Sequence, residues 1–366
     1  MKNNLPGILV INPGSTSTKI SFFYGMEDIF TESIFHDAPL LLSFPTVNDQ
    51  LEMRTQVTLD LLAKHNLSMD DVDIIAGRGG CAYSQKSGVM TIDEKLFNDT
   101  SLDLGGSDHP AKLGVMIAYN LSKKYHKAAY TLNPTNIDEL DNLARVTGIK
   151  GVYRRAQTHA LNQKAIAQIH ANKIGIKYEE ASFIVCHIDG GITISAHKNG
   201  MMVDGTVGAG GDGPFTPTRI GSVPVTELIK LLETKSKEEV LAMCSRAGGF
   251  VSFFGTSNAD TVHKMVEENH EEATRVWNAM IYQICKSIGA MATVLEGKID
   301  GIILTGGLVR FNDIVEGIQK RCGFLGKISC YPGEVEQATL AQGVLDVFTG
   351  KIEPLTYTGE PVFKGF

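Results

Sequence analysis

The stretch Ile8-Leu-Val-Ile-Asn-Pro-Gly-Ser-Thr-Ser-Thr-Lys-Ile-Ser21 decides the fold. An apolar run, a turn of small polar residues and a second run predict a strand, a hairpin turn and a strand. A second stretch, Ile184-Val-Cys-His-Ile-Asp-Gly-Gly-Ile-Thr-Ile-Ser195, begins 176 residues later and repeats this plan. The repetition predicts two α/β domains built on one duplicated pattern, whose two hairpin turns lie across one cleft.

Length and composition agree with two globular domains. The chain has 366 residues, a net charge of −7 and no run rich in Lys and Arg, so we expect no nucleic-acid partner. No apolar stretch reaches the roughly 18 residues of a membrane span, and no signal peptide is visible, so we expect a cytoplasmic protein without a membrane partner. The cysteines form no C-x-x-C pair and are expected to be reduced; they are Cys81, Cys186, Cys244, Cys285, Cys322 and Cys330.

Strands and helices alternate along the rest of the chain, as in α/β proteins. Thr135-x-x-Asp138 resembles a capping box, so we predict a helix over 136–147 that Gly148 ends. A helix over 271–296 carries an apolar stripe that indicates either core or a subunit interface. Other helices are predicted over 54–64, 159–173 and 338–348. We expect one domain over 1–157, completed by 345–366, and a second over 158–344.

Three small turns have the chemistry of phosphate or nucleoside sites. The first spans Asn12–Thr18 and includes Gly14, Ser15, Thr16 and Ser17, whose N–H and hydroxyl groups are donors for phosphate oxygens. The second is Asp189-Gly190-Gly191, and the third is Gly306-Gly307 after a predicted strand at 301–305. Each turn alone is also compatible with an ordinary hairpin or loop, but the three together indicate nucleotide binding.

Several motifs resemble the acetate and butyrate kinase family. They are Asn12 to Lys19, Gly213-Pro-Phe-x-Pro217, Leu304 to Gly307, Tyr331-Pro-Gly-Glu334, and His159-Ala-Leu-Asn-Gln-Lys-Ala165, the last being close to butyrate kinases. The resemblance implies a duplicated actin-like ATPase fold, which is ribonuclease H-like, with a cleft between its two domains. It also implies ATP and Mg²⁺, a homodimer, and reversible phosphorylation of a short-chain fatty acid carboxylate, butyrate or a branched relative, to an acyl phosphate.

The same resemblance implies roles for individual residues. Asn12 would contact the transferring phosphoryl group, Arg78 and Arg219 would flank it, and His159 would donate to it. Arg154 and Arg155 compete with Arg219 for this role. Asp189, Gly190 and Gly191 would form the second phosphate turn, and Gly306 and Gly307 would lie against the adenosine. Two arginines, a histidine and backbone N–H groups suit phosphoryl transfer, which needs alignment and charge stabilisation.

Some positions depart from the family pattern. Asn133 stands where Asp is usual, Asp189 where Gly is usual, Thr218 where Glu is usual, and Asn258 where Asp is expected. Asn133 remains a candidate catalytic residue, because a carboxylic acid substrate is already ionised at pH 7 and needs no general base. The amide could weaken Mg²⁺ placement, and Asp189 could restore the lost charge. Glu316 is a second candidate metal ligand.

Other functions remain open on the sequence alone. Gly208-x-Gly210-x-x-Gly213 matches a dinucleotide fingerprint, but Pro214 and Pro217 prevent the helix that must follow it. Besides an acyl-phosphate-forming kinase, the alternatives are a kinase of this fold for another acid or an alcohol, and a non-catalytic or redirected nucleotide-binding relative. Chain length of the acid is not fixed, because one methylene is worth only about 1–3 kcal/mol in an apolar pocket.

Overall fold

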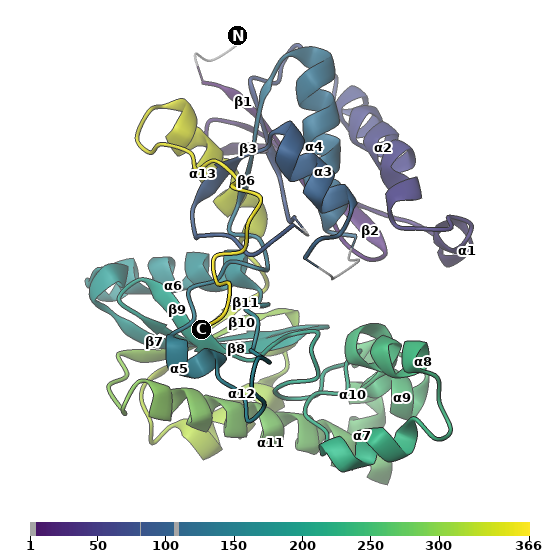
Figure 1. Cartoon of the computed structure of the whole chain (residues 1–366), viewed down its shortest axis with the longest axis vertical. Helices are drawn as coiled ribbons and strands as arrows, with labels where there is room; N and C mark the ends of the chain where they lie inside the picture. Colours follow the sequence, from purple (N-terminus) through teal and green to yellow (C-terminus); the bar gives the residue numbers. More distant parts are fainter. Residues whose placement is uncertain (1–4, 81, 106–109) are drawn as a thin grey trace. The chain divides into compact units, whose positions relative to one another are not determined.

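The computed structural model describes residues 5–80, 82–105 and 110–366. The chain forms two compact units, which we call the N-terminal unit (Met1–Asp138 with Val335–Phe366) and the C-terminal unit (Glu139–Glu334) (Figure 1). The boundaries between the units fall at 138/139 and 334/335. The domain boundaries predicted from the sequence lie at 157/158 and 344/345. The cleft expected between two domains stays a prediction.

The N-terminal unit contains one six-stranded sheet. Its order is β3-β2-β1-β4-β6-β5. Strand β2 runs antiparallel to its neighbours β1 and β3, whereas β4 and β6 run parallel to β1. The strands are β1 (Gly7–Pro13), β2 (Ser17–Tyr24), β3 (Glu27–Phe35), β4 (Ile74–Gly77), β5 (Val89–Thr91) and β6 (Ala128–Leu132). The predicted hairpin of residues 8–24 is therefore confirmed.

Helices cover both faces of this sheet. β1 is buried along its whole length; Leu9 and Ile11 pack in a core with Leu113 of α4, and Ile8 and Val10 point to the opposite face. Helix α13, made by the end of the chain, also packs against β1, β4 and β6 (Figure 1). The helices are α1 (Ala38–Leu42), α2 (Leu51–Lys64), α3 (Glu94–Ser101), α4 (Lys112–Tyr125) and α13 (Glu336–Phe348), with a 3₁₀ turn at Asn48–Gln50.

The C-terminal unit repeats the same sheet plan. Its order is β9-β8-β7-β10-β11, with β7, β8 and β9 forming an antiparallel meander and β10 and β11 parallel to β7. The strands are β7 (Ser182–Ile188), β8 (Ile192–Lys198), β9 (Met201–Gly205), β10 (Gly301–Gly306) and β11 (Ile328–Pro332). β7 takes the place that β1 has in the first sheet, which confirms the duplication inferred from the two hairpin stretches.

Two long helices enclose the second sheet. The apolar stripe of α11 is core rather than surface, because Val276, Met280, Ile284, Ile288, Met291 and Leu295 pack with Ile184 and Ile188 of β7. Helix α6 packs against β7 and β10, on the residues of these strands that point away from α11. The helices are α5 (Asn142–Arg145), α6 (Ala160–Ile174), α7 (Val225–Leu231), α8 (Lys237–Ala242), α9 (Phe250–Phe254), α10 (Ala259–Glu267), α11 (Glu271–Val294) and α12 (Asn312–Cys322), with short turns at Tyr178–Glu180, Met243–Ala247 and Gly307–Arg310.

The helix predicted over 136–147 is wrong. Only Asn142–Arg145 is helical, and Ile137 is instead extended and bridges Gln85 in parallel. The backbone N–H of Asp138 donates to the carbonyl of Gln85 at 2.8 Å. Burial of Ile137 in this bridge outweighs the local capping signal of Thr135, because tertiary packing routinely overrides helix propensity.

The described cysteines are all free thiols. Cys186, Cys285 and Cys322 are buried, whereas Cys244 is half-buried and Cys330 is exposed; Cys81 lies outside the described residues. In the same part of the chain, no helix combines the length and apolar character that spanning a membrane requires.

His197 on β8 makes the stability of the protein depend on pH. Its ring is fully buried, Nδ1 lies 2.8 Å from the Tyr178 hydroxyl, and burial lowers its pKa to about 3. The folded protein therefore keeps His197 neutral while the unfolded chain takes up a proton below pH 6.5, so stability falls as the pH drops from 6.5 towards 3. We expect His197 to account for a loss of about 2 kcal/mol between pH 7 and pH 5.

Urea unfolding of wild type and His197→Gln at pH 7 and pH 5 would measure this contribution. The variant should lose less unfolding free energy between the two pH values than wild type does. It will keep the part due to His36 and His170, whose pKa values burial also lowers. His126→Asn, at an exposed left-handed position, is the control and should retain the wild-type difference. Equal pH dependence in His197→Gln would contradict the assignment.

Candidate active site

The hairpin turn between β1 and β2 is held from inside the N-terminal unit. The Gly14 N–H donates to the Ser17 carbonyl at 2.8 Å. Arg54 of α2, which is fully buried, donates from Nη1 to the carbonyls of Gly14 (3.0 Å) and Ser17 (2.7 Å) and from Nη2 to that of Ser15 (3.4 Å). The His36 N–H binds the Thr16 carbonyl at 2.8 Å. Four successive carbonyls thus face protein donors, while the side chains of Ser15 and Thr16 are exposed.

Arg54 places a positive charge directly behind this turn. It also donates to Oε1 of Gln50 at 3.1 and 3.0 Å and to the Thr18 hydroxyl at 3.1 Å, and burial lowers its pKa to about 10. A guanidinium remains charged at that pKa near pH 7. The turn therefore combines inward carbonyls with a nearby cation, which suits an anionic ligand.

Asn12 and Arg78 meet on one buried carboxylate, that of Glu336 at the start of α13. Nδ2 of Asn12 donates to Oε2 at 3.0 Å. Arg78 forms a bidentate pair, with Nε 2.9 Å from Oε2 and Nη2 3.0 Å from Oε1. Glu336 is 4% exposed and Asn12 is 7% exposed. The structure brings together two of the predicted catalytic residues through a third residue that the sequence analysis did not identify.

The backbone around Arg78 accounts for the Gly-Arg-Gly-Gly pattern. A Cβ at Gly77 would lie 2.4 Å from the Gly114 carbonyl of α4, so only glycine permits this approach. Gly79 has φ +94°, which strongly favours glycine. Arg78 itself follows the end of β4, and the paired carboxylate fixes the orientation of its guanidinium.

Asn133 shapes a loop in the N-terminal unit. Its backbone has φ +40°, a conformation that Asn tolerates better than most residues. Its Oδ1 accepts hydrogen bonds from the Ser87 hydroxyl (2.9 Å) and the Gly88 N–H (2.8 Å), immediately before β5. The side-chain oxygen is thus committed to this turn, and the catalytic role predicted for Asn133 stays a prediction.

In the C-terminal unit, His159 lies at the N-terminus of α6 and its tautomer follows from its neighbours. Nδ1 lies 2.8 Å from the Thr193 hydroxyl on β8. The side-chain amide of Gln163 donates to that hydroxyl at 2.9 Å, so the hydroxyl can direct its own hydrogen to Nδ1. His159 then carries its proton on Nε2, as a donor to a phosphoryl oxygen requires.

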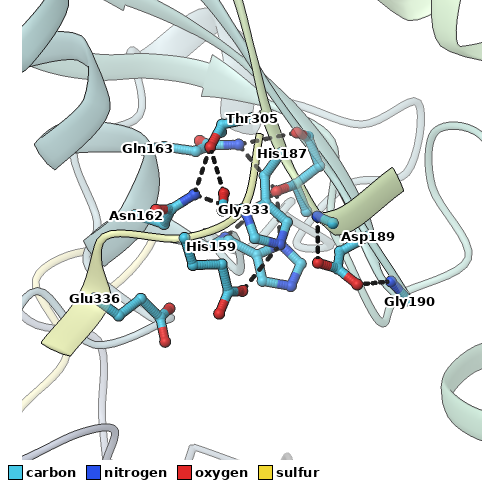
Figure 2. Close-up of polar contacts among 12 residues, drawn as sticks. His159, Asn162, Gln163, His187, Asp189, Gly190, Thr305, Gly333 and Glu336 are labelled. Atoms are coloured by element: carbon cyan, nitrogen blue, oxygen red, sulfur yellow. Dashed lines mark hydrogen bonds and ion pairs between the residues drawn. The ribbon is translucent and has the colours of Figure 1, made fainter. Parts of the chain in front are cut away.

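A second histidine, His187, stacks on His159 with ring centroids 4.0 Å apart (Figure 2). It is the penultimate residue of β7, as Asn12 is of β1, and is 1% exposed. Its Nδ1 lies 3.1 Å from Nδ2 of Asn162, and its Nε2 lies 3.7 Å from Oε1 of Glu334. The two rings therefore bring the start of α6 into contact with the end of β7.

Asp189 occupies two donors of the predicted nucleotide turns. Its Oδ1 accepts the Gly190 N–H at 2.7 Å, and its Oδ2 accepts the Gly307 N–H at 2.6 Å (Figure 2). A Cβ on Gly307 would lie 2.8 Å from Oδ2, whereas a Cβ on Gly190 would meet nothing within 4 Å. The carboxylate therefore joins the turn after β7 to the turn after β10, and the open space lies over Gly190.

Arg219 packs against the glycines of the same region. Its Nη1 donates to the Gly208 carbonyl at 2.7 Å, and a Cβ on Gly191 would meet that nitrogen at 2.7 Å. Its Nε has no partner among the described residues, and burial lowers its pKa. Arg154 instead pairs with Asp204 and Asp212. Gly306 has a packing role, because its Cβ would lie 2.4 Å from the Ile188 carbonyl.

The sequence model of the acetokinase family matches residues 142–327, which is just over half of the chain. The chain belongs to the acetokinase family. The match covers most of the C-terminal unit and includes His159, His187, Asp189 and Arg219.

Solved structures of acetokinases share the fold. The acetate kinase of Porphyromonas gingivalis superposes with a TM-score of 0.75 at 16% identity over 94% of this chain and 100% of its own. A propionate kinase from Francisella tularensis gives 0.76 at 14% over 93% and 99%, and the acetate kinase of Entamoeba histolytica gives 0.74 at 17% over 92% and 98%. The fold predicted from sequence, the duplicated actin-like ATPase fold, is therefore confirmed.

Two carboxylates were expected from sequence as metal ligands in this acetokinase, and the structure separates them. Glu316 is exposed on α12. Asp189 lies instead in a group with His187 and Glu334, whose ligand atoms are all within 4.8 Å of one another. Both assignments of a metal ligand stay predictions.

Several residues of the candidate site were not identified from the sequence. Arg54 stands at the start of a predicted helix, where an arginine usually marks a solvated face. Glu336 lies 324 residues from Asn12 and 258 from Arg78. His187 did have a signal, since it occupies in the second hairpin stretch the strand position that Asn12 occupies in the first.

Proposed function

We propose that this acetokinase transfers a phosphoryl group from ATP to the carboxylate of a short-chain fatty acid, butyrate or a branched relative, and forms an acyl phosphate reversibly. The observation that carries the proposal concerns the butyrate-kinase-like run 159–165. This run buries Asn162, Gln163 and Lys164. Asn162 and Gln163 build the network around His159 and His187, and Lys164 pairs with Glu139 at 2.8 Å.

The residues of the chain suit the chemistry of this transfer. The acid is ionised near pH 7, so no residue has to remove a proton from it. Nε2–H of His159 would donate to an equatorial phosphoryl oxygen, and the cation of Arg219 would stabilise negative charge. The family resemblance implies the same role for Arg78. Gly190, with open space over its Cα, would let a phosphate approach the backbone. Mg-ATP, when bound, supplies the phosphoryl group that these residues align.

One observation favours a second candidate, a relative that binds nucleotide without phosphorylating an acid. The carboxylate of Asp189 holds the N–H groups of Gly190 and Gly307, which a phosphate would otherwise use. A phosphate and a carboxylate repel each other unless a cation lies between them. This candidate predicts nucleotide binding with no acyl phosphate.

A hydroxylamine trap separates the two candidates. The purified protein is incubated with Mg-ATP, hydroxylamine and acetate, propionate, butyrate, isobutyrate or isovalerate, each in a separate reaction. We expect hydroxamate with every acid and the highest kcat/KM for the four- and five-carbon acids. Best use of acetate would contradict the butyrate assignment. ATP binding without hydroxamate from any acid would establish the non-catalytic candidate.

Variants at His159 and Thr193 test the donor role. His159→Ala should lower kcat about 10²–10³-fold, as removal of one transition-state donor does. Thr193→Val removes the hydroxyl that fixes the tautomer but leaves the ring, so it should lower kcat by a smaller factor and leave KM for the acid nearly unchanged. Thr339→Val, whose hydroxyl binds the Val335 carbonyl in α13, is the control. Equal losses in all three variants would remove the role of His159.

We also propose, from the family resemblance, that the enzyme works as a homodimer in the cytoplasm without nucleic-acid or membrane partners. Sedimentation velocity of the full chain would measure the oligomeric state, and a monomer at micromolar concentration would contradict the proposal.

A further inference from the structure

We propose that His187, Asp189 and Glu334 form a binding site for a divalent first-row transition-metal ion in the C-terminal unit. Each residue offers one ligand atom, and these atoms lie within 4.8 Å of one another. One imidazole nitrogen and two carboxylate oxygens suit Mn²⁺ or Zn²⁺, whereas Mg²⁺ and Ca²⁺ prefer sites made of oxygen alone. The inference goes beyond the proposed phosphoryl transfer, because the site needs neither nucleotide nor acid.

The position of the three residues in the sheet supports a ligand site. β7, β10 and β11 are parallel neighbours, and their carboxyl ends meet at one edge, where open α/β sheets bind ligands. His187 and Asp189 stand at the end of β7, and Glu334 follows the end of β11. Gly306 and Gly333 exchange backbone hydrogen bonds of 2.9 and 3.0 Å, which fixes the backbone next to Glu334.

The distances leave space for an ion. Nε2 of His187 and Oε1 of Glu334 are 3.7 Å apart, which is too long for a hydrogen bond. Neighbouring ligand atoms around an ion at roughly 2.1 Å lie about 3.0–3.4 Å apart. A small movement of the exposed Glu334 side chain closes this gap. The two backbone N–H groups that bind Asp189 orient its carboxylate, as outer-shell partners of metal ligands do.

Asn162 can set the tautomer of His187 that a metal requires. Its amide lies 3.1 Å from Nδ1 and 3.2 Å from the Thr305 hydroxyl. A half turn of the amide exchanges its nitrogen and oxygen. The oxygen then accepts the hydrogen of Nδ1, and the Thr305 hydroxyl turns its hydrogen from the Gly333 carbonyl to the same oxygen. Nε2 then presents its lone pair to the ion. The proton moves from Nε2 to Nδ1, so the ring stays neutral and none is lost.

A bound ion would also change the charge of the nucleotide turn. Without it, two carboxylates lie beside the donors of Gly190 and Gly307. A divalent cation on Asp189 and Glu334 would balance their two negative charges and so remove the repulsion of a phosphate. This consequence, unlike the site itself, rests on the proposed function.

Mn²⁺ titration of the EDTA-treated full chain, without nucleotide or acid, tests the site. The electron paramagnetic resonance signal of free Mn²⁺ measures the bound fraction. We expect one saturable site in wild type and at least tenfold weaker binding in Asp189→Asn and in Glu334→Gln. Glu272→Gln, an exposed acid in the first turn of α11, is the matched control and should bind as wild type does. Circular dichroism of each variant checks that it is folded.

The Mn²⁺ titration and the hydroxylamine trap together test the metal site separately from the kinase activity. Absence of saturable Mn²⁺ binding in wild type, or equal affinities in all four proteins, would overturn the metal site. Saturable binding together with no hydroxamate from any acid would leave the metal site standing and overturn the kinase. Hydroxamate formation, together with no saturable Mn²⁺ binding in the absence of nucleotide, would support the kinase and overturn the metal site.

Discussion

Arg54→Met will lower the free energy of unfolding by about 3 kcal/mol, although no substrate has to touch this residue. The substitution leaves the carbonyls of Gly14 and Ser15 without a donor among the described residues, while the Ser17 carbonyl keeps the Gly14 N–H. An orphaned buried acceptor costs about 1–3 kcal/mol. Loss of the cation recovers part of this cost, because burial already disfavours the charge and lowers its pKa to about 10. The cost of the lost hydrogen bonds therefore exceeds the gain from removing the buried charge.

Urea unfolding at pH 7 would measure the effect, with Arg275→Met as the matched control. Arg275 is exposed on α11 and pairs only with Glu271 one helical turn away, at 3.3 Å, among the contacts of the described residues. Such surface pairs contribute about 0–1 kcal/mol. Arg54→Lys should fall between wild type and Arg54→Met, since an ammonium keeps the charge without the planar fork. Similar losses in Arg54→Met and Arg275→Met would show that the turn does not depend on Arg54.

Glu336→Ala will have the second large effect, a loss of about 3–5 kcal/mol in unfolding free energy. The variant leaves the guanidinium of Arg78 and the amide of Asn12 without their shared buried carboxylate, and breaking a buried pair on one side carries this cost. Arg78→Ala should destabilise too, and should lower kcat/KM at least about 10²-fold through loss of a charged donor.

A double-mutant cycle separates pairing from packing. Arg78→Ala with Glu336→Ala should lose less stability than the sum of the single variants, by more than about 1 kcal/mol. The exposed pair Lys177–Glu180, with atoms 3.0 Å apart, is the control cycle and should couple by less than about 1 kcal/mol. Additive losses at Arg78 and Glu336 would show that the bidentate pair contributes nothing as a pair.

Local pattern was sufficient for the two hairpins and their duplication, whereas the actin-like fold and the roles of the site residues came from the family resemblance. Strand, small turn and strand in 8–21 and again in 184–195 are short-range signals, so both hairpins and their duplication followed from them. The helix predicted over 136–147 failed because Ile137 is extended against Gln85, a contact that no local signal reports.

The missing parts of the candidate site depend on contacts between distant segments. Glu336 lies just before the helix predicted over 338–348, and only the packing of α13 against β1 and β4 reveals its role. Asp189 illustrates the opposite case. The departure from glycine was visible in the sequence, but its meaning depends on the turn after β10, whose Gly307 N–H the carboxylate binds.

The distance along the chain between Arg78 and Glu336 has a consequence for biosynthesis. A ribosome that adds roughly 5–20 residues per second needs about 13–50 s to make the 258 residues between them. During that time the whole C-terminal unit is completed, while Asn12 and Arg78 still lack the carboxylate that joins them. Products of premature termination between residues 78 and 336 therefore contain Asn12 and Arg78 but not the carboxylate that joins them. The contacts of Asn12 and Arg78 with Glu336 can therefore form only after translation has passed residue 336.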